Sequence, residues 1–323
     1  MKKFNIKGMT GVMAIAIAAL AFTSCENGEN EFPGYDKCNV YFANQYVMRT
    51  VELGEDLEVD LTNDNNHIVE VRAAMGGGYG NDHDITLEYT IDNSLIEGKQ
   101  FADGSAMEVL PANYYTIENN KMVIPAGSIQ GGIKIKLTDA FFADENATKK
   151  HYVLPIKLTN VSGADSILES KNFILYGLKF VNPWHATYLR RGVDNFSDGS
   201  KVVRHTQYVE KYPLQTITTS GFMNAQMTIN MKNSEGKDIP CTLDLKFDGE
   251  NKCSISTATQ GFSATGNGTF VIKGEKNSMG GKDRNALYLN YSIKSDELNT
   301  TMTTTDTLVV RNRGIAPEYF TVK

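Results

Sequence analysis

Apolar and polar residues alternate with a period of two along much of this chain. Between residues 223 and 231 the odd positions are Met, Ala, Met, Ile and Met, and the even positions are all polar. Successive side chains of a strand point to opposite faces of a sheet, so this pattern predicts a strand with one buried and one exposed face. Residues 287–293 repeat the pattern, and long amphipathic helical patterns are absent. The sequence therefore predicts an all-β protein.

Residues 37–180 form a first block, in which short apolar runs are separated by turn residues. The strands expected in it are 39–43, 46–53, 57–61, 68–74, 85–91, 114–117, 121–124, 132–137, 152–158 and 173–180. Seven or more short strands at this spacing are typical of an immunoglobulin-like β-sandwich.

Residues 181–323 form a second block, which begins at Val181-Asn182-Pro183. Its expected strands include 202–209, 223–231, 268–273, 287–293 and 308–313, together with a hairpin over 239–258. About eight strands joined mostly by short loops favour an antiparallel up-and-down β-barrel of lipocalin-like shape. A second β-sandwich is the alternative.

Two of the four cysteines fall on the 239–258 hairpin. Placing its apolar residues on one face sets Leu245 opposite Cys253 across the turn that contains Asp248-Gly249-Glu250. Cys241 then lies roughly 13 Å away along the sheet, at about 3.3 Å per residue. A disulfide needs Cα atoms within about 7 Å, so both cysteines are expected to be buried thiols.

Residues 1–24 predict a cleaved export signal. Three lysines precede an apolar run over residues 11–22, which is too short to span a bilayer. The run ends in Phe22-Thr23-Ser24-Cys25, and small residues directly before a cysteine are typical of a bacterial lipoprotein signal. We expect lipidation at Cys25, where several acyl chains would anchor the protein stably. The alternative is cleavage after Ala19-Leu20-Ala21, which would release a soluble secreted protein.

Residues 25–36 are predicted to be an acidic, solvated tether. Residues 26–31 contain three glutamates and no apolar side chain, a composition that cannot bury enough surface to fold. An acidic stretch directly after a lipidated cysteine resembles the export signal of surface-exposed lipoproteins in the Bacteroidota. It implies an outer-membrane protein that faces the cell exterior, whereas the alternative is an ordinary polar spacer.

Charge and motifs narrow the function classes. The chain has 38 acidic and 32 basic residues, a formal net charge of −6, and nucleic-acid binding needs clustered Lys and Arg. The five histidines show no metal-binding spacing, and no Gly-x-Ser-x-Gly elbow is present. The sequence therefore predicts a non-catalytic protein with no metal, no cofactor and no nucleic-acid partner. A cryptic glycoside hydrolase, which needs only two suitably spaced carboxylates, is the less favoured alternative.

Six residues are candidates for ligand binding. Tyr79, Asn81 and Asp82 follow a run of glycines and could present a ring and hydrogen-bonding groups on an exposed loop, although a merely flexible connection is the simpler interpretation. The other three, at the start of the second block, are Trp184, Tyr188 and Arg190. Aromatic rings stack on sugars, but a lone tryptophan after a linker is more often a domain-junction anchor.

The signal and acidic tether, the segment from Tyr114-Tyr115 to Gly127 and the Pro183-Trp184-His185 junction together resemble a known family. It comprises two-domain surface lipoproteins of Bacteroidota glycan-utilisation (Sus-like) loci, whose N-terminal domain of unknown function also precedes endoglycosidase domains. The resemblance implies a polysaccharide or glycan ligand and a neighbouring outer-membrane importer or glycosidase as partner. No glycosidase domain is attached, because small β domains account for both blocks. A structural or adhesive envelope protein remains the alternative.

Overall fold

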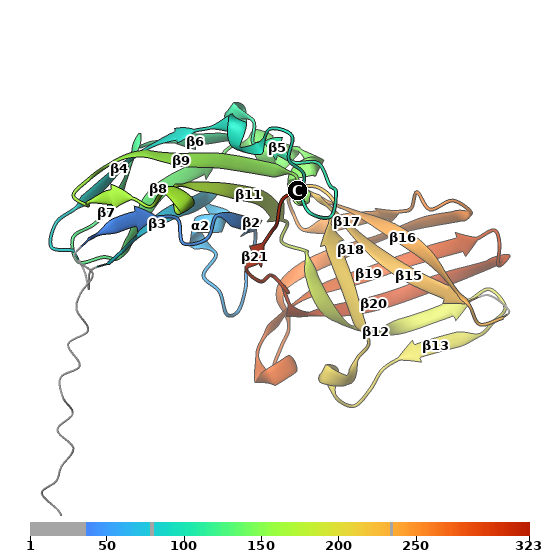
Figure 1. The fold of residues 1–323 in the computed structure, drawn as a ribbon. Helices are drawn as coiled ribbons and strands as arrows, with labels where there is room; N and C mark the ends of the chain where they lie inside the picture. The colour runs from blue at the N-terminus through green and yellow to red at the C-terminus, as the bar shows by residue number, and fades with distance from the viewer. Residues whose placement is uncertain (1–36, 78–80, 233–234) are drawn as a thin grey trace, which may run out of the picture.

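The computed structural model describes residues 37–323 except 78–80 and 233–234, and it shows two β units side by side (Figure 1). The first is a mixed sheet folded over a core and the second is a closed antiparallel barrel, so the predicted fold class is confirmed. Residues 1–36, with the predicted signal, Cys25 and the tether, lie outside the described residues. In the described part, no helix combines the length and apolar character needed to cross a membrane.

Twelve strands make up the sheet of the first unit. They are β1 (Asn39–Tyr41), β2 (Tyr46–Glu52), β3 (Ile68–Gly76), β4 (Ile85–Ile91), β5 (Glu108–Val109), β6 (Tyr115–Ile117), β7 (Lys121–Ile124), β8 (Gln130–Leu137), β9 (Tyr152–Ser162), β10 (Ser166–Ile167), β11 (Phe173–Val181) and β21 (Glu318–Tyr319).

The sheet of the first unit folds over a single large core. Only one residue pair, Val123 with Gly132, joins β7 to β8, so the strands on either side of this seam can turn to face each other. Buried residues of β3 and β8 pack in one cluster with those of β4, β9 and β11. Three pairs, β1–β10, β2–β11 and β5–β9, are parallel, which makes the sheet mixed.

Short helical turns connect these strands. They are α2 (Thr62–Asn65), α3 (Asp139–Ala143), η1 (Asn93–Ile96), η2 (Ala112–Tyr114), η3 (Glu145–Thr148) and η4 (Glu169–Lys171).

The strand expected over residues 57–61 is wrong. Asp56 accepts hydrogen bonds from the backbone N–H groups of Glu58 and Val59, at 2.7 and 3.1 Å, and Asp60 accepts one from Thr62 at 2.9 Å. Aspartate side chains that bond their own neighbouring backbone favour turns over strands. The segment is therefore a loop that leads into α2.

The second unit is built from a meander. Its elements are β12 (Ala186–Phe196), β13 (Lys201–Arg204), η5 (Val209–Lys211), β14 (Leu214–Thr219), β15 (Asn224–Lys232), β16 (Asp238–Phe247), β17 (Lys252–Ser256), β18 (Phe262–Glu275), η6 (Met279–Gly281), β19 (Arg284–Ser295) and β20 (Thr300–Asn312). Strands β14 to β20 pair in sequence order, and β12 pairs with both β14 and β20. This double pairing closes eight strands into a barrel and rules out the second sandwich, while β13 lies outside the ring as an extra strand on β12.

Apolar side chains fill much of the barrel interior, as the alternating pattern predicts. Met227, Leu243 and Leu287 are representative, each at most 1% exposed. The register of the hairpin is two residues away from the expected one, since Phe247 lies opposite Cys253 and Leu245 lies opposite Ile255. A shift of two residues keeps every side chain on its face. Cys241 and Cys253 are both buried and free.

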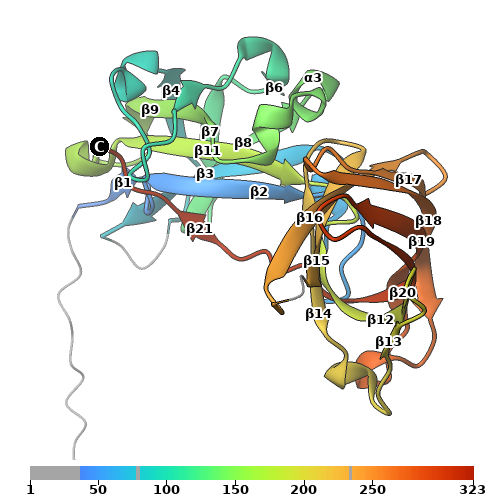
Figure 2. The same ribbon diagram turned by 90° about the vertical axis from the view of Figure 1, so that its right-hand side faces the viewer.

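The chain ends in the first unit and not in the barrel. β21 pairs with β2 (Figure 2), Val322 forms an isolated bridge with Phe101, and Phe320 packs in a satellite cluster of the first unit. The expected block over residues 181–323 does not include this return to the first unit. The chain therefore crosses between the units twice, once at residues 181–185 and once after β20.

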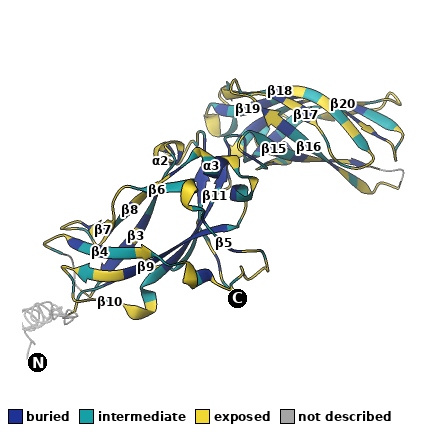
Figure 3. Ribbon diagram, turned by 90° about the horizontal axis from the view of Figure 1, so that it is seen from above, coloured by how far each residue is buried: buried dark blue, intermediate teal, exposed yellow. Residues whose placement is uncertain are grey.

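Side chains also connect the two units. Phe222 of the barrel packs against Phe142 and Phe180 of the first unit, with ring centroids 5.9 and 6.4 Å apart. The Asn182 amide donates to the carbonyl oxygens of Gly221 and Asn224, at 3.1 and 2.8 Å. Buried residues continue along β11 to this junction (Figure 3).

Candidate functional site: a pocket between the two units

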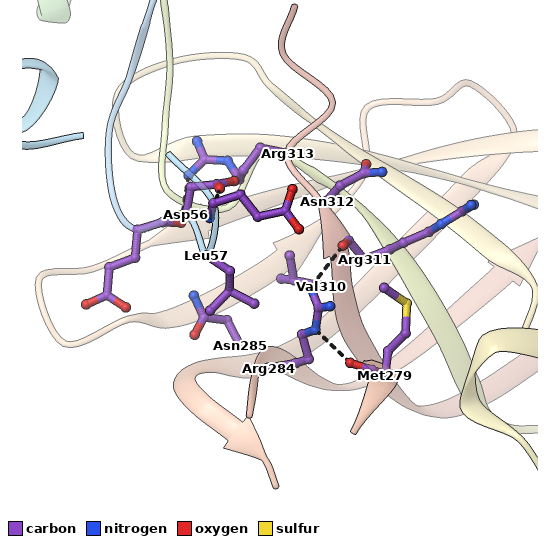
Figure 4. Close-up of a pocket in the computed structure, with 11 residues that line it drawn as sticks. Asp56, Leu57, Met279, Arg284, Asn285, Val310, Arg311, Asn312 and Arg313 are labelled. Carbon is purple, nitrogen blue, oxygen red and sulfur yellow. Dashed lines mark hydrogen bonds between the residues drawn. The ribbon is translucent and has the colours of Figure 1, made fainter. Parts of the chain in front are cut away.

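A pocket of about 210 Å³ opens where the two units meet (Figure 4). One wall is the loop that follows β2, and the other is formed by η6, the start of β19 and the end of β20. The lining residues are Glu55, Asp56, Leu57, Glu58, Met279, Arg284, Asn285, Val310, Arg311, Asn312 and Arg313.

The loop after β2 is shaped by its own side chains. At Gly54, where φ is +101°, an added Cβ would lie 2.8 Å from the Cβ of Pro183, so only glycine lets the loop leave the junction this closely. Beyond it, Asp56 holds the turn through the backbone bonds described above. Leu57 is left 45% exposed at the pocket.

Arg284 positions the opposite wall. Its side chain is buried and donates hydrogen bonds to the carbonyl oxygens of Met279 and Arg311, both at 3.2 Å (Figure 4). These two bonds fasten η6 to the end of β20. Because both guanidinium contacts are to backbone atoms, Arg284 supports the pocket without occupying it.

Arg313 forms the back of the pocket and joins the units. It is 5% exposed and donates to the carbonyl oxygens of Leu53, at 3.0 Å, and Asn182, at 2.9 Å. Burial lowers the pKa of this guanidinium, and the nearby carboxylate of Glu52 partly opposes that shift. Burial likewise raises the pKa of Glu52.

His185 lies on the same junction. Burial and the charges of Arg313 and Lys179 lower its pKa to about 4, so it is neutral near pH 7.

The remaining lining groups can bind a ligand. Carboxylates of the β2 loop and the amides of Asn285 and Asn312 surround an apolar surface made by Leu57, Val310 and Met279. An apolar surface with a few polar groups around it is typical of small-molecule sites. Within the described residues, no group of three or more His, Cys, Asp or Glu side chains is placed to hold a metal ion.

Trp184 and Tyr188, two of the predicted site residues, lie inside the barrel. The Trp184 ring is 2% exposed and stacks on Phe247, with centroids 3.8 Å apart and an interplanar angle of 4°. Tyr188 is fully buried and donates from its hydroxyl to the Trp184 carbonyl at 2.7 Å. Both side chains are thus part of the barrel core.

Arg190 belongs to a charged cluster inside the same barrel. Its Nε donates to Asp306 at 2.9 Å, Tyr291 donates to the same carboxylate at 2.9 Å, and Arg204 reaches the other oxygen of Asp306 at 2.8 Å. Arg204 also pairs with Asp194. Burial would lower the pKa of Arg204, but hydrogen bonds and charge from the two aspartates raise it.

The other three candidates belong to the β3–β4 loop, at the end of the first unit away from the barrel (Figure 1). Tyr79 lies outside the described residues. The Asn81 amide donates to the carbonyls of His83 and Pro125, at 3.0 and 3.1 Å, and Asp82 contacts His83 at 2.5 Å. The structure therefore separates this group from Trp184, Tyr188 and Arg190, and neither group lines the inter-unit pocket.

Sequence reasoning missed the residues that do line the pocket. A concentration of charge is the signal that could have found them, because Glu55, Asp56 and Glu58 stand close together and Arg311-Asn312-Arg313 ends the strand expected over 308–313. The assignment of residues 57–61 to a strand hid the first group, and only the three-dimensional structure brings the two groups together.

Comparisons with known proteins identify the family. Residues 183–314 match a model described as a domain of unknown function (DUF5627), and residues 35–165 match a model of an N-terminal domain. A crystal structure of a Bacteroides ovatus protein of unknown function is 40% identical, with a TM-score of 0.84, and the match covers 90% of this chain and 99% of that one. The chain belongs to the same family as this Bacteroides ovatus protein.

A second Bacteroides ovatus structure is described as that of a proposed carbohydrate binding protein. It is 11% identical with a TM-score of 0.30, over 86% of this chain and 99% of that one. This likeness is too low to bear on fold or function. No curated protein matches the chain.

Proposed function

We propose that this protein is a non-catalytic lipoprotein of the outer membrane, anchored through Cys25, that binds glycans at the cell exterior in the pocket between its two units. The observation that carries the proposal is the lining of that pocket. The apolar surface of Leu57, Val310 and Met279 suits the C–H faces of a sugar ring. Carboxylates accept hydrogen bonds from hydroxyl groups, and amides both donate and accept them.

The sequence of the first 36 residues supports the proposed location. The signal, the cysteine and the acidic tether support a surface lipoprotein, and the relative from Bacteroides ovatus agrees with the resemblance to surface lipoproteins of the Bacteroidota. In this role, the protein would retain a glycan near the membrane and pass it to a neighbouring outer-membrane importer or glycosidase.

A binding assay on the mature chain, residues 25–323, tests the ligand class. We expect saturable retardation in native gels that contain a polysaccharide from a panel of plant and host glycans. The double variant Leu57→Ser with Asn312→Ala should weaken the binding about tenfold, equivalent to about 1.4 kcal/mol, because it removes one apolar contact and one hydrogen-bonding group.

The matched control for this assay is Ile129→Ser. Ile129 is 56% exposed in the first unit and does not line the pocket, so its substitution should leave the retardation unchanged. The proposed site would be contradicted if no glycan of the panel retarded the protein, or if the pocket variant were retarded as strongly as the wild-type chain.

Replacing Cys25 with alanine tests the anchor. The wild-type chain should be found in the outer-membrane fraction and be digested by protease added to intact cells. The Cys25→Ala chain should move to the soluble fraction with the same melting temperature, because the substitution removes the acyl chains from a segment that the sequence predicts to be a solvated tether. A variant that stayed with the membrane would disprove lipid anchoring at this residue.

A further inference from the structure

A second depression, of about 450 Å³, adjoins the inter-unit pocket on the outer surface of the barrel. Its lining residues are Leu189, Glu210, Tyr212, Leu214, Met279, Gly280 and Arg311. Met279 and Arg311 also line the inter-unit pocket. Because the two depressions share these side chains, they adjoin each other. Together they are called the groove, which extends from the β2 loop past η6 to η5 and the start of β14.

We infer that this groove takes an extended, uncharged oligosaccharide chain of several sugar residues, with the inter-unit pocket holding only part of it. The inference rests on the proposed function and specifies its ligand. Three observations support it: the size of the groove, the surface of its second part and the charges that are available to a ligand.

Size separates a chain from a single sugar. Small-molecule sites usually measure about 300–1,000 Å³. The inter-unit pocket alone, at about 210 Å³, is below that range, whereas the two depressions together fall within it. A ligand that fills only the pocket would leave most of the groove empty.

The second part of the groove has a firm apolar surface. Leu189, Tyr212 and Val309 are each less than 10% exposed and pack together on the outside of the barrel, with Met279 against them. Leu214 is 56% exposed beside them. The exposed side chain of Leu214 on this buried base suits the C–H face of a further sugar unit.

Arg311 connects the two parts and has an available guanidinium. Its backbone carbonyl accepts from Arg284, while its side chain extends away from Asp56 and Leu57 (Figure 4). The residue is exposed, and within the described part of the chain its side chain makes no hydrogen bond or ion pair. Arg284 and Arg313 are occupied by backbone carbonyls, so Arg311 is the arginine that can donate to two neighbouring hydroxyl groups of a ligand.

The charges along the groove favour an uncharged chain over an anionic one. Carboxylates of Glu55, Glu58 and Glu210 line it together with the one available guanidinium of Arg311. The excess of carboxylates would repel uronic acids and sulfated sugars. Hydroxyl groups can satisfy both kinds of side chain.

Calorimetric titration of the mature chain with graded oligosaccharides tests the inference. The probes are gluco-, manno- and xylo-oligosaccharides of increasing length, with oligogalacturonate and chitosan oligomers as the charged counterparts. For the neutral series that binds, we expect the affinity to rise at least tenfold from the disaccharide to the longest chain.

Two variants locate the effect. Leu214→Ser should weaken binding of the longest chain at least fivefold and leave the disaccharide unaffected, whereas Arg311→Ala should weaken the longest chain at least tenfold. The matched controls are Ile129→Ser and Arg72→Ala, whose side chains are exposed on the first unit. Neither should change any affinity.

The outcomes separate this inference from the function on which it rests. Binding that does not depend on chain length, is insensitive to Leu214→Ser, or is stronger for a charged series would overturn the extended neutral ligand while leaving a glycan-binding pocket in place. Absence of binding by every probe would overturn this inference, and failure of the whole glycan panel as well would overturn the proposed function.

Discussion

Two regions of this protein bury arginine side chains and satisfy them in different ways. At one end of the barrel interior, Arg190 and Arg204 are balanced by Asp194 and Asp306. At the junction between the units, Arg313 donates its hydrogen bonds to backbone carbonyl oxygens. The barrel thus compensates the arginine charges with carboxylates that they contact. At the junction the guanidinium of Arg313 contacts backbone dipoles, and the carboxylate of Glu52 is nearby.

The difference follows from what each location offers. The barrel cluster lies among strands whose backbone groups already pair with one another, so only side chains can serve the guanidinium groups. Gly192 makes room for it, since a Cβ there would lie 2.4 Å from an oxygen of Asp306. The junction is different because parallel strands β2 and β11 end at the same edge, where the carbonyls of Leu53 and Asn182 accept from Arg313. The Asn182 carbonyl also accepts from the backbone N–H of His185 at 3.2 Å.

The comparison predicts its largest effect at Asp306. Asp306→Ala would leave two guanidinium groups facing one carboxylate in a buried site, and breaking a buried ion pair in this way costs about 3–5 kcal/mol. We expect the melting temperature of the barrel to fall by at least about 6 °C. Thermal unfolding followed by tryptophan fluorescence reports on the barrel, because Trp184 is the only tryptophan.

A double variant distinguishes loss of charge balance from loss of packing. Arg190→Met with Asp306→Leu removes one charge of each sign and keeps apolar volume, so Arg204 and Asp194 remain as a neutral pair. This protein should be more stable than Asp306→Ala alone. If the double variant were the less stable of the two, the charge balance would not explain the cluster.

Much of the fold is predictable from the sequence because it depends on local patterns. The strands 85–91 and 121–124 match the expected bounds, since alternation and flanking turn residues are read over a few positions. The barrel follows from consecutive strands joined by short loops. Local patterns fail at residues 57–61. Their apolar side chains indicate a strand, but Asp56 and Asp60 bond the neighbouring backbone and turn the chain.

The site is less predictable because it depends on long-range contacts. Residues 55–58 and 310–313 meet only because the barrel docks against the end of β2, and no spacing in the sequence reports that docking. Trp184 and Arg190 stand out by residue type, yet the structure uses the first in stacking and the second in an ion pair. Rare residue types indicate important positions without showing whether a ligand or the core uses them.

We expect a smaller loss of stability from substitution of Arg313 at the junction than from substitution of Asp306 in the barrel cluster. Arg313→Ala would leave the carbonyl of Leu53 without this donor and the carbonyl of Asn182 with only the backbone N–H of His185. Both carbonyl groups are neutral, and the variant also removes a desolvated charge. We expect a loss of about 1–3 kcal/mol, the usual cost of unsatisfied polar groups. In calorimetry, the first unit and the barrel of this variant should unfold over a wider temperature range than in the wild-type chain, because their unfolding is less tightly coupled.

Arg313→Lys keeps the charge but not the forked guanidinium that reaches two acceptors. Its stability should lie between that of the wild-type chain and that of Arg313→Ala. Equal destabilisation by Arg313→Ala and Asp306→Ala would remove the distinction between compensation by dipoles and compensation by charge.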